Sequence, residues 1–175
     1  MKGYHGRFLE VDLNRRTTKD FPITEDFCKK YIGGAAMAAA LIYDRVTPDL
    51  AALSPESPLV MATGPFTGSS IPMVSRYAVA GISPLTGYWG EATSGGVFPF
   101  RLKGSGWDGI IVTGRAESPV YLYLKDGKAE IRDASEIWGK DTYETPSLIR
   151  QETGDPKVIW EAHFAGIEMG YCHME

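Results

Sequence analysis

The chain has 175 residues, of which 43% are hydrophobic and 23% charged, and its formal net charge is −4. This length is typical of one domain, so we expect residues 1–175 to form a single domain with an irregular tail at 165–175. The acidic balance argues against nucleic acid as a partner, and no apolar run approaches the ~18 residues of a membrane span.

The N-terminus lacks the apolar segment of a secretory signal, so the predicted location is cytoplasmic. Two cysteines, Cys28 and Cys172, lie far apart and form no CxxC pair, which argues against a disulfide framework. We expect Cys28 to be a buried small hydrophobic residue.

The chain opens with a predicted hairpin and a predicted helix. Residues 8–13 alternate between apolar and polar, and residues 17–21 can return as the partner strand. Thr24 is placed to cap a helix, whose apolar residues recur at spacings of three and four as far as Val46. Pro48 ends that pattern.

Gly33 and Gly34 lie inside the predicted helix, where each costs about 1 kcal/mol relative to alanine. Something must compensate for that cost. The glycines indicate either close packing of the helix on a sheet or contact with a ligand or a partner chain.

Residues 61–96 are rich in glycine, proline, serine and threonine, with one cation, Arg76, in their midst. No continuous apolar helical face can be drawn through them, so they predict short strands linked by tight turns. Glycine lets another group approach the main chain closely. Bare backbone beside an arginine and many hydroxyls suits a large polar ligand that carries phosphate.

The remaining predicted elements alternate short strands with short helices. They are strands at 59–62, 77–81 and 109–113, a helix at 96–102, a hairpin of 120–125 and 129–132 around Asp126-Gly127, a helical turn at 134–138, a helix from Thr145 with Pro146 as its first helical residue and Gly154 as its stop, and a last strand at 157–164. Strands outnumber helices, and neighbouring strands mostly pair as hairpins. The predicted fold class is therefore α+β, with two antiparallel-rich β-sheets and a few covering helices.

No catalytic constellation is visible. The three histidines form no HExxH pattern, and neither GxSxG nor GxxxxGK[ST] occurs, so neither a zinc site nor a nucleophile with its base is indicated. Glu91 stands alone among the glycines, as a solvated loop acid would. No catalytic residue and no metal-ligating residue can be named in this chain.

Arg76 is the strongest single candidate for binding, because a guanidinium group is always charged and can bind phosphate with two hydrogen bonds. A surface ion pair or a role in clamping a loop is the alternative. Ser94-Gly95-Gly96 precedes a predicted helix, and bare amides before a helix can form an anion-binding nest.

A series of motifs in this order and spacing resembles one known family. The motifs are Gly6-Arg7-x-Leu9-x-Val11-Asp12-Leu13, Tyr31-Ile32-Gly33-Gly34, Gly64-Pro65-Phe66-Thr67-Gly68, Ser75-Arg76-Tyr77, Ser83-Pro84-Leu85-Thr86-Gly87, Ser94-Gly95-Gly96, Leu102-Lys103-x-x-Gly106-Trp107-Asp108-x-Ile110, Pro119-Val120-Tyr121-Leu122 and Trp138-Gly139-Lys140-Asp141. Over residues 3–158 the chain resembles the N-terminal domain of the tungsten-containing aldehyde:ferredoxin oxidoreductases.

The resemblance implies a function. Enzymes of this family oxidise aldehydes to carboxylic acids and pass the electrons to ferredoxin. They hold tungsten, or in the alternative molybdenum, between two pterins whose phosphates are bridged by magnesium, beside a [4Fe-4S] cluster. The N-terminal domain is the base on which the pterins lie, and Arg76, Thr93 and Gly95 match positions that contact the pterin.

The chain also departs from the family pattern. Thr93 stands where the family usually has asparagine, Ile82 replaces a common lysine, and residues 160–166 differ from the family's segment. The family's cluster cysteines, second pterin-binding segment and catalytic acid and histidine lie beyond the matching region. We therefore expect a truncated chain or a short paralogue that is inactive alone.

Two hypotheses remain. The first is a pterin-binding oxidoreductase domain, with Arg76, Thr93, Ser94, Gly95 and Gly96 as its cofactor-binding residues. The second is a non-catalytic binding or assembly module. Candidate partners are ferredoxin, a separate catalytic chain and a second copy of this one.

Overall fold

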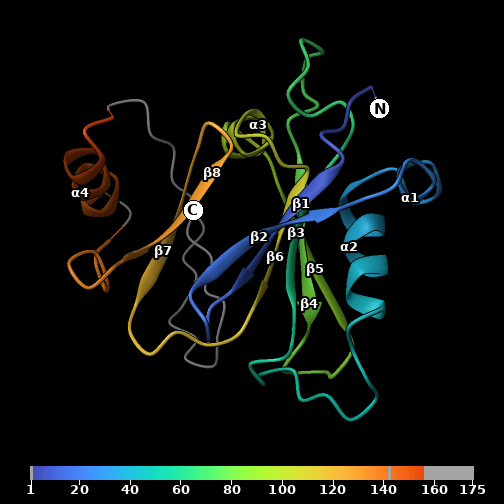
Figure 1. Cartoon of the computed structure of the whole chain (residues 1–175), viewed down its shortest axis with the longest axis horizontal. Coiled ribbons are helices and arrows are strands. Elements are labelled where there is room, and N and C mark those ends of the chain that lie inside the picture. The colour runs from blue at the N-terminus through green and yellow to red at the C-terminus, as the bar shows by residue number, and fades with distance from the viewer. Residues whose placement is uncertain (1, 142, 156–175) are drawn as a thin grey trace.

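A computed structural model describes residues 2–141 and 143–155 (Figure 1). These residues form eight strands and four helices. In chain order they are β1 (Arg7–Asp12), β2 (Thr17–Pro22), α1 (Glu25–Tyr31), α2 (Gly34–Tyr43), β3 (Leu59–Thr63), β4 (Tyr77–Ile82), β5 (Trp89–Ser94), α3 (Phe98–Gly104), β6 (Gly109–Thr113), β7 (Val120–Lys125), β8 (Lys128–Asp133) and α4 (Glu144–Thr153).

The strands form one large sheet and one hairpin. Six strands pair in the order β2-β1-β6-β3-β4-β5, and β7 pairs with β8 in a separate two-stranded sheet. All pairs are antiparallel except β1 with β6, which run parallel. The predicted α+β class with antiparallel-rich sheets is therefore confirmed, and β5 is a strand for which no bounds were predicted.

The large sheet is apolar on both faces. Neighbouring residues of a strand point to opposite sides, and in the central strands both sets of residues are apolar. Phe8, Val60 and Ile111 belong to the core under α1 and α2. Their neighbours Leu9, Met61 and Ile110 belong to a second core on the other face, which α3 and the β7–β8 hairpin cover. Figure 1 shows α1 and α2 on one side of the sheet and the hairpin on the other, with α4 outermost.

The long helix predicted from Thr24 to Val46 is wrong, since α1 ends at Tyr31 and α2 starts at Gly34. Ile32 has φ 62° and ψ −61°, and the Gly33 N–H donates to the Tyr31 carbonyl at 2.7 Å. This is a γ-turn with positive φ, a rare and strained conformation that ends a helix. The apolar spacing that suggested one helix is shared by two helices on the same core.

The cap predicted at the start of the first helix is confirmed. The Thr24 hydroxyl accepts a hydrogen bond from the Phe27 N–H at 3.1 Å, and Glu25 and Asp26 occupy the first turn. Cys28, one turn later, is 2% exposed, as predicted for a small hydrophobic residue. Burial raises the pKa of its thiol, which favours the unreactive protonated form.

We expect Thr24→Ala to destabilise the fold by about 1 kcal/mol, because the Phe27 N–H loses its acceptor. For a chain of this size that corresponds to a fall of roughly 2–4 °C in the thermal midpoint, measured by circular dichroism. Thr24→Ser keeps the hydroxyl and serves as the control. Equal midpoints for the alanine and serine variants would show that the cap adds nothing.

The C-terminal elements follow the prediction closely. The β7–β8 hairpin turns at Asp126-Gly127, and Trp138 N donates to the Ala134 carbonyl in the predicted helical turn. α4 starts at Glu144, where the N–H donates to Asp141 Oδ1 at 2.7 Å. Pro146 is therefore the third residue of the helix, and its predicted place as the first helical residue is wrong. The strand expected at 157–164 and the tail at 165–175 lie outside the described residues. Within those described, no helix combines the length and apolar character needed to cross a membrane.

Candidate functional site

A pocket of about 540 Å³ lies where the first turn of α2 meets the loop after β3 and the start of β4. Its size falls within the range of sites for small molecules and cofactors. The lining residues are Ile32, Gly33, Gly34, Ala35, Gly64, Pro65, Phe66, Thr67, Val74, Arg76, Tyr77, Ala78 and Thr93. Segments far apart in the chain therefore meet at one opening.

Arg76 supplies the charged group of this pocket. Its side chain is exposed, and no carboxylate among residues 2–141 and 143–155 forms an ion pair with it. Its backbone is held firmly: the N–H donates to the Val74 carbonyl at 2.9 Å, and the carbonyl accepts from Thr67 Oγ1 at 3.0 Å. A guanidinium in this setting is available to an anionic ligand.

Thr93 shares the pocket because β5 pairs with β4. Thr93 lies directly opposite Ala78, and opposite residues of a pair face the same side of the sheet. Gly95, just past the end of β5, approaches Arg76: a Cβ added at Gly95 would lie 3.6 Å from Arg76 Nε. The structure therefore brings together Arg76, Thr93 and Gly95.

The other two candidates have structural contacts of their own. Ser94 pairs with Tyr77 in the ladder between β5 and β4. Gly96 has φ 81°, and its carbonyl accepts from Ser75 Oγ at 2.6 Å. Like Gly95, neither of them lines the pocket, and Val97 separates Gly96 from α3, which starts at Phe98.

Gly33 allows α2 to approach the loop after β3 at very short range. A Cβ at this position would lie 2.8 Å from Gly64 Cα and 2.9 Å from the Thr63 carbonyl oxygen. Close packing on the sheet thus explains Gly33, the first of the two alternatives left by the sequence. The same approach leaves Gly33, Gly34 and Gly64 as bare backbone around the pocket.

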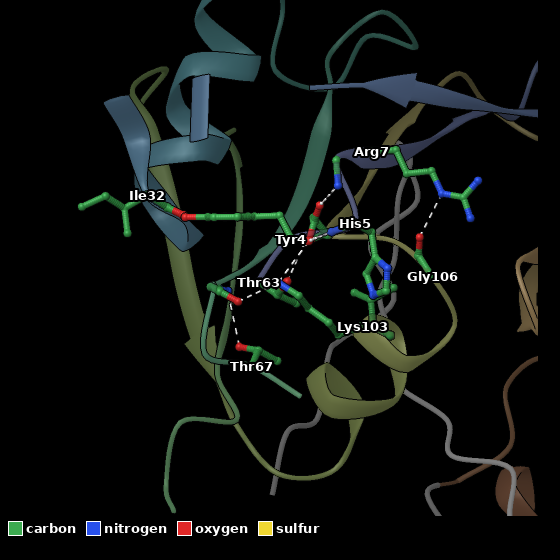
Figure 2. Close-up of polar contacts among 12 residues, drawn as sticks. Tyr4, His5, Arg7, Ile32, Thr63, Thr67, Lys103 and Gly106 are labelled. Atoms are coloured by element: carbon green, nitrogen blue, oxygen red, sulfur yellow. Dashed lines mark hydrogen bonds and ion pairs between the residues drawn. The ribbon is translucent and has the colours of Figure 1, made fainter. Parts of the chain in front are cut away.

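Tyr4 braces the strained turn at the pocket rim. Its hydroxyl donates to the Ile32 carbonyl at 2.7 Å, and Figure 2 shows the ring reaching from the N-terminal segment to that residue. Burial, with smaller contributions from Cys28 and Asp108, raises the pKa of the Tyr4 phenol. The phenol therefore stays protonated and able to donate over a wider pH range.

Lys103 and Asp108 form a buried ion pair under the pocket, with N–O distance 3.0 Å and side-chain exposures of 7% and 1%. Lys103 Nζ also donates to the Gly64 carbonyl at 2.8 Å (Figure 2). The Asp108 carboxylate accepts from the backbone N–H groups of His5 and Gly6. In the sequence both residues belong to the motif Leu102-Lys103-x-x-Gly106-Trp107-Asp108, and their spacing of five gives no sign of a buried pair.

Other chemistry-bearing side chains give no second site. Glu91 is exposed on β5 and accepts from the Trp89 indole at 3.0 Å, in keeping with a solvated acid. Over the described part of the chain, no three His, Cys, Asp or Glu side chains gather as metal ligands would. His163, Cys172 and His173 lie outside that part.

Comparison with known proteins gives consistent matches. The family model described as "Aldehyde ferredoxin oxidoreductase, N-terminal domain" matches residues 8–167. The chain is 45% identical over 158 residues to the tungsten-containing aldehyde ferredoxin oxidoreductase of Pyrococcus horikoshii, and 46% identical over 158 residues to that of Pyrococcus furiosus. Each match covers 90% of this chain and 26% of the relative, so the chain spans about a quarter of their length.

A solved structure has the same fold. It is described as the active site complex BamBC of benzoyl coenzyme A reductase in complex with 1,5 dienoyl-CoA. The TM-score is 0.86 at 34% identity, and the match covers 89% of this chain and 24% of that one.

Proposed function

Because the chain belongs to the aldehyde ferredoxin oxidoreductase N-terminal domain family, we propose that it is the pterin-binding platform of an oxidoreductase. The reaction would convert an aldehyde to a carboxylic acid and pass electrons to ferredoxin. The observation that carries this proposal is the pocket in which Arg76 and Thr93 face glycine backbone from α2 and the β3 loop.

The residues of the pocket fit a pterin that carries phosphate. Arg76 offers a planar, permanently charged group, and no acid within the described residues neutralises it. At Gly34 and Gly64 an added Cβ would meet no atom closer than 4.0 Å, so the bare backbone there borders open space for a flat ring system. The apolar walls from Ala35, Pro65 and Phe66 suit the faces of such a ring.

Each candidate residue then has a distinct role. Arg76 would bind the cofactor phosphate, and Gly95 would let that phosphate approach the main chain beside the guanidinium. Thr93 stands where the family usually has asparagine, so a magnesium contact made by the backbone carbonyl would survive this change, whereas one made by the asparagine side chain would not be conserved. Ser94 and Gly96 would support this arrangement through their bonds to β4 and Ser75.

The bound cofactor, a tungsten or molybdenum bis-pterin with magnesium, would supply the redox chemistry, and this chain would bind and orient it. In the family the [4Fe-4S] ligands and the catalytic acid and histidine lie beyond the matching region, so other parts of the full assembly would supply them. This division agrees with a chain that spans a quarter of its relatives' length.

The direct test measures tungsten, molybdenum and pterin in the protein purified from its host without oxygen. We expect one of the two metals together with pterin, bound to this chain or to a complex that contains it. Inductively coupled plasma mass spectrometry gives the metal, and fluorescence of the oxidised pterin released on denaturation gives the cofactor. Protein that holds neither, with or without a co-purified partner, would contradict the proposal.

The second candidate is a non-catalytic binding module that assembles with a separate chain. Large apolar side chains are exposed near the pocket and the β4–β5 turn, among them Phe66 at 61%, Met73 at 96% and Leu85 at 92%. Such residues commonly mark contacts with other proteins. A stable complex without pterin or metal in the same purification would favour this candidate.

A further inference from the structure

The buried Lys103–Asp108 pair lies outside the pocket lining, but it connects directly to the backbone that carries the lining. Lys103 is on α3, and its ammonium group reaches the Gly64 carbonyl at the end of β3 (Figure 2). Gly64 also accepts from the Thr67 N–H at 3.2 Å. The lysine therefore holds the first residue of the turn that forms one wall of the pocket.

From this turn the contacts continue to Arg76. The Thr67 side chain is 4% exposed, and its hydroxyl lies 3.0 Å from the Arg76 carbonyl and 3.3 Å from the Val74 carbonyl. Asp108, Lys103, Gly64, Thr67 and Arg76 thus form one continuous chain of polar contacts. It starts in the core and ends at the backbone carbonyl of Arg76, the residue that carries the guanidinium of the pocket.

The chemistry of Lys103 suits a supporting role and excludes direct contact with a ligand. Its ammonium has three N–H donors. One faces the Gly64 carbonyl and one faces Asp108, and the Tyr4 ring lies 5.3 Å from the nitrogen. Lys103 is 7% exposed and does not line the pocket, so it is not placed to contact a ligand there.

We propose that Lys103 is a positioning residue: paired with Asp108, it fixes the Gly64–Thr67 turn and so sets the place of Arg76 for its ligand. This inference rests on the proposed function for the identity of that ligand, a phosphate-bearing pterin. The fixing of the turn itself does not depend on the ligand and can be measured separately.

The test variant is Lys103→Met with Asp108→Asn, which removes both charges and leaves no unpaired buried ion. The matched control is Arg45→Met with Glu10→Gln. Arg45 likewise pairs with a carboxylate, donates to a backbone carbonyl (Leu41, 2.8 Å) and lies over an aromatic ring. It follows the C-terminal end of α2, whereas the pocket is at the first turn of that helix.

The first measurement is hydrogen–deuterium exchange of the peptides that cover residues 63–77, in protein purified from its host. We expect exchange at Thr67 and Arg76 to rise by about tenfold in the Lys103 variant, the effect of roughly one lost hydrogen bond. The Arg45 control should leave these peptides unchanged. A folded Lys103 variant with wild-type exchange there would overturn the proposal.

The second measurement is pterin retained per chain, alone and combined with Arg76→Ala. If Lys103 acts through Arg76, the Lys103 variant should lose about tenfold in retention by itself and nothing further in the Arg76→Ala background. Losses that multiply would show that Lys103 acts independently of Arg76 and would overturn the proposal.

The same experiments also cover two further outcomes: wild-type protein that holds no pterin, and a Lys103 variant that does not fold. Wild-type protein without pterin would refute the proposed function, while the exchange measurement would still decide whether Lys103 fixes the turn. If the Lys103 variant does not fold, Thr67→Val breaks the next contact and leaves the ion pair intact. It should raise exchange at Arg76 in the same way, and unchanged exchange would overturn the proposal.

Discussion

Replacing Arg76 with alanine is expected to lower pterin retention by about ten- to a hundredfold, the range that follows from losing hydrogen bonds to a charged group. The side chain is exposed and forms no ion pair within the described residues, so its removal should leave the thermal midpoint nearly unchanged. Pterin released on denaturation, per mole of chain, gives the measurement.

Two variants sharpen this result. Arg101→Ala removes an exposed arginine from α3, outside the pocket, and should retain pterin at the wild-type level. Arg76→Lys keeps the charge but loses the planar fork, so we expect retention between those of the alanine variant and the wild type. If Arg76→Ala and Arg101→Ala retain equal amounts, Arg76 does not bind the phosphate.

The largest effect on stability is expected from Gly109→Ala, at about 3 kcal/mol or more, because over-packing of this site cannot be relieved by side-chain movement alone. Gly109 starts β6, where its pairing partner is Ala62. A Cβ there would overlap the Met61 carbonyl oxygen and the Phe8 ring, and both lie in the core of the large sheet.

The corresponding measurement is thermal unfolding, with an expected fall in the midpoint of roughly 6–12 °C. Gly104→Ala is the matched control. Gly104 ends α3, and a Cβ there would meet no atom within 4 Å, so alanine should be neutral or slightly stabilising. If the Gly109→Ala variant were as stable as the Gly104→Ala variant, β6 and its neighbours would accommodate the added Cβ without cost, and the prediction would be wrong.

Local patterns predicted most of the elements. The Thr24 cap, the Asp126-Gly127 turn and the alternating or continuous apolar runs of β1, β3 and β6 each carry their own signal, and each appears in the structure. The break at Ile32 was missed because a β-branched residue rarely adopts positive φ. It is imposed by Gly33 packing on Gly64, a contact between residues far apart in the chain.

In the candidate site, too, local sequence signals predicted some features and long-range packing determines the others. Arg76 and the glycines around it stood out by composition, and register between β4 and β5 places Thr93 and Gly95 beside Arg76. The contribution of α2 to the pocket and the buried Lys103–Asp108 pair could not be foreseen. Both depend on how the sheet and helices pack, and a lysine in a sequence usually predicts an exposed residue.

The order of the large sheet also has a consequence for how the chain folds. The β1–β2 hairpin and the β3–β4–β5 meander can each form from neighbouring residues, but β6 lies between them and is the last strand of that sheet to be synthesised. Until residues 109–113 have been synthesised, no backbone hydrogen bonds of the sheet connect the β1–β2 hairpin to the β3–β4–β5 meander. Closure must then bring β1 alongside a strand about a hundred residues later, and such long-range pairing folds slowly. During synthesis the inner edges of both halves therefore stay unpaired, and aggregation is most probable in this interval.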